Sequence, residues 1–188
     1  MMPRFLMPGF LAPGFPRAAL ALLGAALALS GCNERLTICP GVAVLADAAI
    51  RPVLKPGSAA VDPSAQLYRV EMTGISQRCI LDVNDGQSDS NIRISFRAIR
   101  APSGQAARYN VPYFVAVNSA ERIITKRGFN ATVEFPAGAA AVVFETTVNS
   151  AVLKFENGRL PSEYQFLAGL EMSDAERAYV KAMGNVTP

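Results

Sequence analysis

Thiols and carboxylates are the groups in this 188-residue chain that could do chemistry, because the chain has three cysteines and no histidine. Without imidazole, it lacks Ser-His-Asp and Cys-His nucleophile systems and any histidine general base. Zinc sites that need histidine are excluded, and three cysteines do not complete a four-cysteine site. The sequence therefore predicts no catalytic residue and no cofactor, and we expect the protein not to be an enzyme.

The densest group of oxygen ligands lies between residues 82 and 89 and could bind a calcium ion. Its members are Asp82, Asn84, Asp85 and Asp89. The spacing differs from an EF-hand loop, because Gly86 comes one residue early and no glutamate follows. Asp85-Gly86 between two alternating segments is also a hairpin signal. We therefore predict a turn, with a weak calcium site as the alternative.

A hydrolase built on carboxylates would need two of them to be brought together in a cleft by folding. The sequence offers Glu134, Glu145, Glu156 and Glu163 as candidates, but no motif groups them. This function therefore ranks last among those considered.

The first 31 residues have the composition of a signal peptide. Arg4 and Arg17 supply positive charge, and residues 18–29 form an uninterrupted apolar run. This run matches the apolar region of a signal peptide, about 7–15 residues, and is shorter than the roughly 20 residues of a membrane-spanning helix. We therefore predict that residues 1–31 are removed, with translation starting at Met1, Met2 or Met7.

The apolar run ends in Leu29-Ser30-Gly31-Cys32, which resembles the lipobox of bacterial lipoproteins at all four positions. The resemblance implies a diacylglycerol thioether on Cys32, cleavage before Cys32 and acylation of the freed amine. Two or three acyl chains anchor a protein stably, whereas one is marginal. Asn33, in place of aspartate, implies the outer membrane and a periplasm-facing domain. The alternative is an ordinary secretory signal that ends in Gly-Cys.

Cys39 and Cys79 remain once Cys32 carries a lipid, and an even number of cysteines in an oxidising compartment favours a disulfide. The bond would close a loop of about 40 residues and, by chain entropy, stabilise the fold by roughly 4 kcal/mol. It would attach the N-terminal strand to an interior strand. A reactive thiol pair is the alternative, although there is no Cys-x-x-Cys spacing or histidine to lower a thiol pKa.

The net charge of +3 gives no sign of nucleic-acid binding, because two of the basic residues lie in the segment predicted to be removed. A basic stripe for lipid phosphates or an acidic partner could form from Arg69, Arg93, Arg97 and Arg100. More often such residues form the solvated face of a half-buried strand. The aromatic residues Tyr109, Tyr113 and Phe114 indicate either an exposed interaction surface or a buried strand.

The sequence after residue 39 predicts a mainly β domain. Alternating or apolar segments predict strands at 41–48, 67–75, 78–83, 91–100, 111–118, 121–126, 129–135, 140–148, 151–155 and 164–171. Residues 50–65, rich in proline, read as a loop, and Pro112 suggests an edge strand or a strand entry. Short strands without βαβ alternation predict an antiparallel two-sheet sandwich, Ig-like in broad class.

One short helix is predicted at the C-terminus. Ser173 and Glu176 have the spacing of a capping box. Apolar residues that recur at helical spacing predict a face packed on the sheet rather than a cofactor site: Met172, Ala175, Tyr179 and Met183.

Several segments after the lipobox are similar to uncharacterised alphaproteobacterial lipoproteins. They are Cys39-Pro40, Val44-Leu45-Ala46-Asp47-Ala48, Cys79, Tyr113-Phe114-Val115-Ala116 and Phe135-Pro136. The resemblance covers most of the mature chain, implies an envelope location and supplies no catalytic residues. The expected organisation is a signal peptide (1–31), a lipidated tether (32–38) and one sandwich domain (39–188).

The function expected from these features is a non-enzymatic interaction module or an accessory subunit of an envelope complex. Its expected partners are the membrane, through the Cys32 lipid, and an envelope protein. The alternative is a small-ligand or lipid-binding protein, which would need an apolar cavity between the sheets.

Overall fold

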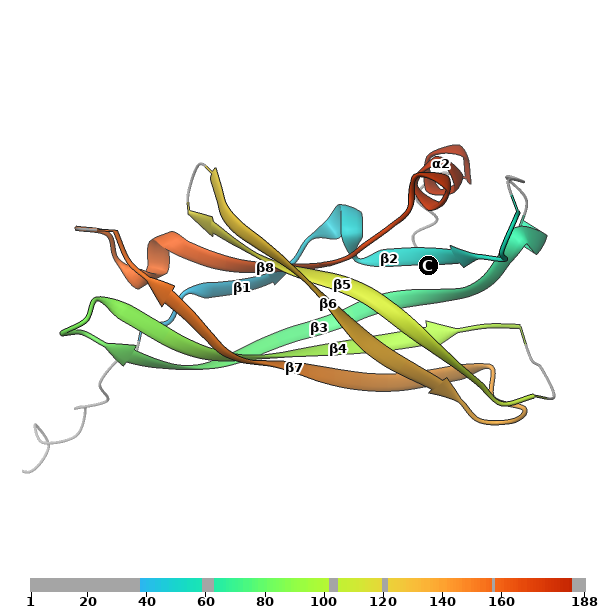
Figure 1. The fold of residues 1–188 in the computed structure, drawn as a ribbon, viewed down its shortest axis with the longest axis horizontal. Coiled ribbons are helices and arrows are strands. Elements are labelled where there is room, and N and C mark those ends of the chain that lie inside the picture. Colours follow the sequence, from blue (N-terminus) through green and yellow to red (C-terminus); the bar gives the residue numbers. More distant parts are fainter. Residues whose placement is uncertain (1–37, 59–62, 102–104, 120–121, 157, 184–188) are drawn as a thin grey trace, which may run out of the picture. The chain divides into compact units, whose positions relative to one another are not determined.

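The fold comes from a computed structural model that describes residues 38–58, 63–101, 105–119, 122–156 and 158–183. In these residues eight strands form two four-stranded sheets packed face to face, with one helix near the C-terminus (Figure 1). The predicted two-sheet sandwich is thereby confirmed. The signal peptide, the lipobox and residues 32–37 of the tether lie outside the described residues. None of the helices in the described segments is long and apolar enough to cross a membrane.

Each sheet contains four strands, and nearly all neighbours are antiparallel. The first sheet contains, in order, β1 (Gly41–Val44), β8 (Tyr164–Leu170), β5 (Ala107–Ser119) and β6 (Arg122–Phe135). The second contains, in order, β2 (Ile50–Leu54), β3 (Gln66–Asp82), β4 (Gln87–Ile99) and β7 (Ala141–Lys154). Only β1 and β8 pair in parallel among the described strands. The strand order differs from the ABED and CFG sheets of immunoglobulin domains, which share the sandwich architecture.

The core lies between the two inward faces. On β4 the predicted alternation is present, because Ile92, Ile94, Phe96 and Ala98 are all fully buried. Phe96 meets Tyr113 of the opposite sheet edge-to-face, with ring centroids 5.7 Å apart. Such aromatic pairs add about 0.5–1.5 kcal/mol beyond the area they bury. The sheets are therefore joined by interdigitated side chains along their length.

Two β-bulges show why two pairs of predicted strands are single strands. In β3 the register with β4 shifts at Thr73, which has no partner. In β7, Asn149 and Ser150 lie opposite Asn91 alone, and the Ser150 amide donates to Asn91 Oδ1 at 3.1 Å. One extra residue reverses which side chains face inward. The apolar residues before and after each bulge therefore all face the core, although they occupy even positions on one side of the bulge and odd positions on the other.

Four further strand predictions are wrong. The strand predicted at 41–48 ends at Val44, and Ala46–Ala48 form a 3-10 turn. Residues 50–54 form β2 rather than a loop, and Pro52 is tolerated because β2 is an edge strand. The segments predicted at 121–126 and 129–135 are joined as β6. Pro112 lies in the interior strand β5, and its carbonyl accepts the Glu171 amide at 3.0 Å just beyond the β8 ladder. The N–H that proline lacks would point to the same side as this carbonyl, beyond the last paired residues of β8. No hydrogen bond within the β5–β8 ladder is therefore lost.

The aromatic segment is a buried strand rather than an exposed surface. Tyr113 faces the core and is 2% exposed, and Tyr109 stacks on Tyr68. Phe114 lies on the outer face of the first sheet in a small cluster with Ala48, Ala116 and Leu167. A Cβ on Gly169 would lie 2.6 Å from the Phe114 ring, so glycine is required for this close approach.

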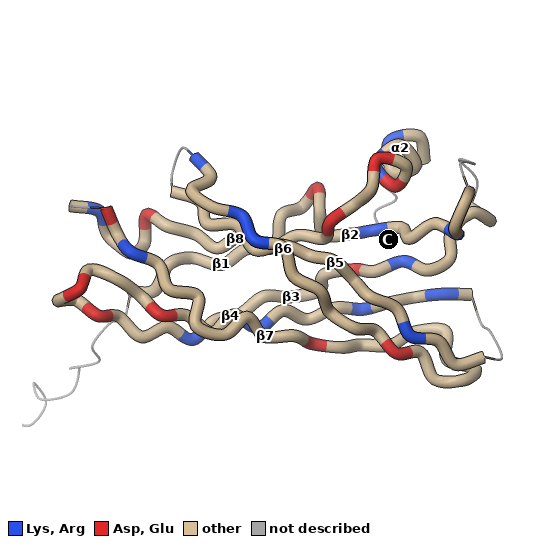
Figure 2. Tube along the Cα trace, in the orientation of Figure 1, with Lys and Arg blue, Asp and Glu red and all other residues tan. Residues whose placement is uncertain are grey.

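The outer face of the second sheet carries charges of both signs. Arg69 pairs with Glu71 at 2.6 Å, and Arg97 lies opposite Glu71 in the β3–β4 ladder. Arg93 lies 4.0 Å from a glutamate of β7. Figure 2 shows basic and acidic residues interspersed along the strands. These arginines fit the solvated face of a half-buried strand, balanced by carboxylates, rather than a uniform basic stripe.

Arg100 does not belong to that face. Its side chain is mostly buried and lies over the Phe135 ring, with Cζ 4.4 Å from the centroid. The guanidinium donates to three backbone carbonyls at 2.9–3.1 Å, those of Gln105, Pro136 and Ala139. Because these carbonyls belong to the loops at one end of the sheets, Arg100 holds those loops together.

Helix α2 (Asp174–Met183) begins with the predicted capping box. Ser173 Oγ accepts the Glu176 amide at 3.2 Å, and Glu176 Oε2 accepts the Ser173 amide at 2.8 Å. The packed face differs from the predicted stripe, because Ala175 is exposed while Glu176 and Tyr179 are buried. Arg51 of β2 explains this difference, since it binds the Glu176 carboxylate through Nε and Nη2 at 2.9–3.1 Å.

Candidate functional site

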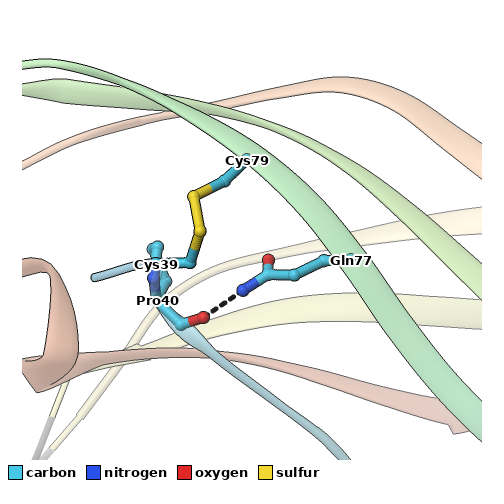
Figure 3. Close-up of a disulfide and its surroundings, with 4 residues drawn as sticks. All are labelled: Cys39, Pro40, Gln77 and Cys79. Atoms are coloured by element: carbon cyan, nitrogen blue, oxygen red, sulfur yellow. Dashed lines mark hydrogen bonds between the residues drawn. A yellow bond between two sulfur atoms is a disulfide. The ribbon is translucent and has the colours of Figure 1, made fainter. Parts of the chain in front are cut away.

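A disulfide joins Cys39 and Cys79, the pair that the sequence predicts, with their Cα atoms 6.0 Å apart (Figure 3). Cys39 directly precedes Pro40 and β1, and Cys79 lies in β3, so the bond connects the first sheet to the second. Gln77 adds a second link by donating from Nε2 to the Pro40 carbonyl. These contacts fit the structural interpretation of the two cysteines, in which the bond fastens the N-terminal strand to the sandwich.

Two serines lie on strand β4 beside the disulfide-bonded part of β3. Ser90 lies directly opposite Cys79 in the β3–β4 ladder, and Ser88 lies opposite Leu81. Both serines are fully buried on the inward face of β4, in the row that continues with the larger Ile92. Because protein interiors are closely packed, a serine opposite Cys79 takes up less of the interior than the isoleucine that follows in the same row.

The pairing of the strands shows which other segments lie at the same end of the sandwich as the disulfide. The Phe155 amide donates to the Gly86 carbonyl at 2.8 Å, which places the end of β7 beside the β3–β4 turn. In the first sheet one row contains Gly41, Gln165, Asn118 and Ile123. We use the name disulfide end for the part of the sandwich where these segments meet. It contains residues 38–40, the β3–β4 turn, the ends of β5 and β7, the start of β6 and residues 158–163.

The calcium candidates lie at this end, and the hairpin turn is confirmed. Asp82 Oδ1 accepts the amides of Asn84 and Asp85, both at 3.1 Å, and Gly86 has a φ of 59°. Asp89 lies further along β4, opposite Ile80. Within the described segments, no group of three or more acidic, cysteine or histidine side chains is arranged to hold a metal ion. Asp82 therefore holds the turn through its side chain, and Asp89 lies on the strand that follows the turn.

Each of the four candidate glutamates has a separate structural contact. The contacts are Glu134 with Arg108 at 3.3 Å, Glu145 with Ser95 Oγ at 2.9 Å, Glu156 with Arg122 at 2.7 Å and Glu163 with the Leu160 amide at 2.6 Å. These contacts lie on β6, on β7, after β7 and in the 3-10 turn Pro161–Glu163. None of these contacts joins two of the four candidates.

The opposite end of the sandwich, which we call the helix end, is held by the Arg51–Glu176 pair between β2 and α2. The two side chains are 13% and 5% exposed, so the pair is largely removed from water. Tyr68 lies beside it, and burial raises the pKa of Tyr68 to about 12 despite the opposing Arg51 guanidinium. Sequence reasoning missed this pair, because residue 51 fell in a predicted loop.

A surface depression of about 470 Å³ lies at the start of β5 and the end of β6. It is lined by Ala106, Ala107, Arg108, Glu134, Phe135 and Pro136. Because β5 and β6 are neighbours in the first sheet, this depression is not the apolar cavity between the sheets that the ligand-binding alternative requires.

Comparison of the chain with protein-family models, with curated proteins and with solved structures gave no match.

Proposed function

We propose that the protein is an envelope lipoprotein, anchored through lipid on Cys32, whose β-sandwich faces the periplasm as a non-enzymatic interaction module or accessory subunit. The observation that carries this proposal is the lipobox-like segment Leu29-Ser30-Gly31-Cys32 at the end of a signal-peptide-like apolar run. Asn33 supports the outer membrane as the site of the anchor.

The disulfide supports the same compartment by an independent route. Disulfides persist in oxidising compartments such as the bacterial periplasm and are rare in the cytosol. The Cys39–Cys79 bond lies within the sandwich and begins seven residues after the proposed lipidated cysteine. A chain that is exported, lipidated at one cysteine and oxidised at the other two accounts for all three cysteines.

The role as an interaction module is supported by how the polar side chains are used. Asp82 holds a turn, Glu163 holds a 3-10 turn and Glu176 holds the helix. Arg100 binds backbone carbonyls. A sandwich whose polar residues are committed to such contacts is a rigid scaffold that presents surfaces.

Lipidation is tested by labelling cells with radioactive palmitate and separating membrane from soluble fractions. We expect Cys32→Ala to abolish the label and to yield an unprocessed or soluble product. The matched control is the Cys39→Ser, Cys79→Ser double variant, which loses two cysteines and should keep both the label and the membrane association. Unchanged processing and membrane association of Cys32→Ala would disprove the anchor.

The partner is tested by crosslinking the tagged, lipidated protein in cells and identifying the products by mass spectrometry. We expect one dominant envelope protein, because an accessory subunit spends most of its time in its complex. If no specific protein is crosslinked, the interaction module is contradicted. Extraction of the purified protein into organic solvent would then test for a bound lipid or small ligand.

A further inference from the structure

Exposed apolar side chains are concentrated at the disulfide end. The structure describes nine large apolar residues as exposed, and Leu45 and Val143 are the two that lie elsewhere. The other seven are Ile38, Ile80, Val83, Ile123, Ile124, Val152 and Leu160. Val83, in the β3–β4 turn, is the most exposed at 87%. Single exposed apolar residues are normal on a protein surface, but here seven of the nine lie at one end of the sandwich.

These seven residues lie at this end of the molecule on both sheets. Ile80 and Val152 lie on either side of Asp89 in one row of the second sheet. Ile123 lies in the row of the first sheet that begins with Gly41, two residues after Cys39. Leu160 precedes the 3-10 turn that leads into β8. The apolar residues therefore surround the end of the sandwich instead of forming a patch on one face.

The disulfide fixes the point at which the tether meets the domain. Seven residues lead from Cys32 to Cys39, and a chain of that length spans at most about 25 Å when fully extended. Because Cys39 is bonded to Cys79, the tether cannot lengthen by releasing β1 from the sandwich. A lipid on Cys32 therefore holds the disulfide end, and not the helix end, close to the bilayer.

We propose that the disulfide end rests on the bilayer surface, with Val83, Leu160 and the neighbouring apolar side chains in the headgroup region. This inference depends on the proposed Cys32 anchor and adds an orientation to it. The contact lies at the depth where apolar side chains of interfacial segments meet the acyl chains, about 5–10 Å into the membrane. The sandwich then stands with its helix end directed away from the membrane.

A membrane fits this end better than a protein partner. A protein interface needs a continuous complementary area, whereas a bilayer is fluid and meets separate residues around an end at once. The end also carries charged residues of both signs, as the mixed colours of Figure 2 show; they include Asp82, Asp85 and Asp89 in the β3–β4 hairpin and Arg122, Lys154 and Arg159 in the neighbouring segments. Their charge opposes deep insertion, so the contact is shallow and the lipid provides most of the attachment.

The absence of tryptophan from the sequence allows single-tryptophan reporters. Val83→Trp places the probe at the disulfide end. Ala137→Trp is the matched control, in the exposed turn between β6 and β7 at the other end of β4, about 40 Å away along the 13 residues of that strand. Both sites are exposed turns, and Leu160→Trp serves as a second reporter should Val83→Trp misfold.

Each lipidated variant is reconstituted into vesicles of phosphatidylethanolamine and phosphatidylglycerol whose acyl chains carry bromine, a contact quencher of tryptophan. We expect Val83→Trp to lose at least about half of its fluorescence, because a residue at the headgroup and acyl boundary meets the quencher. Ala137→Trp should be unaffected. Adding Cys32→Ala to Val83→Trp should restore most of the fluorescence.

The outcomes separate the inference from the anchor. If palmitate label is present but neither Val83→Trp nor Leu160→Trp is quenched, the orientation is wrong and the lipoprotein proposal stands. Equal quenching of Val83→Trp and Ala137→Trp would also overturn it, because the domain would then lie flat. If Val83→Trp is unquenched and a crosslinker at residue 83 captures one protein, the end is a protein interface. Absence of the label would remove the anchor itself.

Discussion

The two ends of the sandwich are closed by different chemistry. The disulfide end is closed by the Cys39–Cys79 bond, and the helix end by the Arg51–Glu176 pair between β2 and α2. A disulfide stabilises mainly by restricting the unfolded chain, and it does so independently of pH in the neutral range. A buried ion pair must first offset the cost of removing both charges from water. The free energy of unfolding therefore falls most when only one partner is removed and the other charge stays buried. We therefore expect the free energy of unfolding to fall when the disulfide is reduced, and also when one partner of the ion pair is substituted.

The largest effect is expected from removing the covalent link. Cys39→Ser with Cys79→Ser, in a Cys32→Ala background for solubility, should lower the free energy of unfolding by about 4 kcal/mol, because the unfolded chain regains the entropy of a 40-residue loop. Urea unfolding measures this change. Reducing the parent protein is the matched control and should give the same midpoint as the double variant. A loss below about 1 kcal/mol would mean that the unfolded chain gains little from opening the loop.

Breaking the ion pair at the helix end should cost slightly less. Arg51→Ala leaves Glu176 charged and buried without its partner, and we expect a loss of about 3 kcal/mol in the free energy of unfolding. The double variant Arg51→Met, Glu176→Met should recover much of that loss, because an apolar pair needs no desolvation. Equal losses for the single and the double variant would contradict the view that an unpaired charge is the cause.

The same end should show a pH response above the neutral range. Burial raises the pKa of Tyr68 from 10 to about 12, so the folded state binds its phenol proton more tightly than the unfolded state. The stability contributed by Tyr68 is therefore complete below pH 10 and is lost as the pH rises to 12. Urea unfolding from pH 9 to 12 should give a shallower decline for Tyr68→Phe. An identical decline in both proteins would show that Tyr68 is not the titrating group.

The smallest effect is expected from an exposed pair on the outer face of the second sheet. Arg93 and Glu145 are 65% and 52% exposed and 4.0 Å apart. Arg93→Ala should change the free energy of unfolding by less than about 0.5 kcal/mol, because exposed pairs contribute little. The same urea series measures it. A loss comparable to that of Arg51→Ala would show that burial is not what distinguishes the helix end.

Local periodicity predicted much of the fold, because alternation in a strand is a property of adjacent residues. It predicted the inward face of β4 and the capping box at Ser173. It did not predict that β3 continues through residues 76 and 77 or that β7 continues through Ser150, because a bulge that changes the phase of alternation is defined by the partner strand across from it. Each bulge looks like the end of one strand and the start of another when the sequence is read alone.

The candidate site was predictable where the chain offered only one choice. With Cys32 assigned to lipid, Cys39 and Cys79 could pair only with each other. The Arg51–Glu176 pair could not be predicted, since its members are 125 residues apart and one lay in an expected loop. The grouping of exposed apolar residues at the disulfide end could not be predicted either, because their proximity depends on how five separate segments meet.

The parallel pair of β1 and β8 has a consequence for the order in which the domain folds. Gly41 pairs with Gln165, so β1 can complete its pairing only with a strand that lies more than 120 residues later in the chain. Pairings of such high contact order form slowly. Cys39 needs only a partner 40 residues away, and once bonded it keeps β1 beside the growing sandwich at a high effective concentration. Oxidation therefore shortens the length of chain that separates β1 from β8, because the path through the disulfide starts at Cys79 instead of at Gly41.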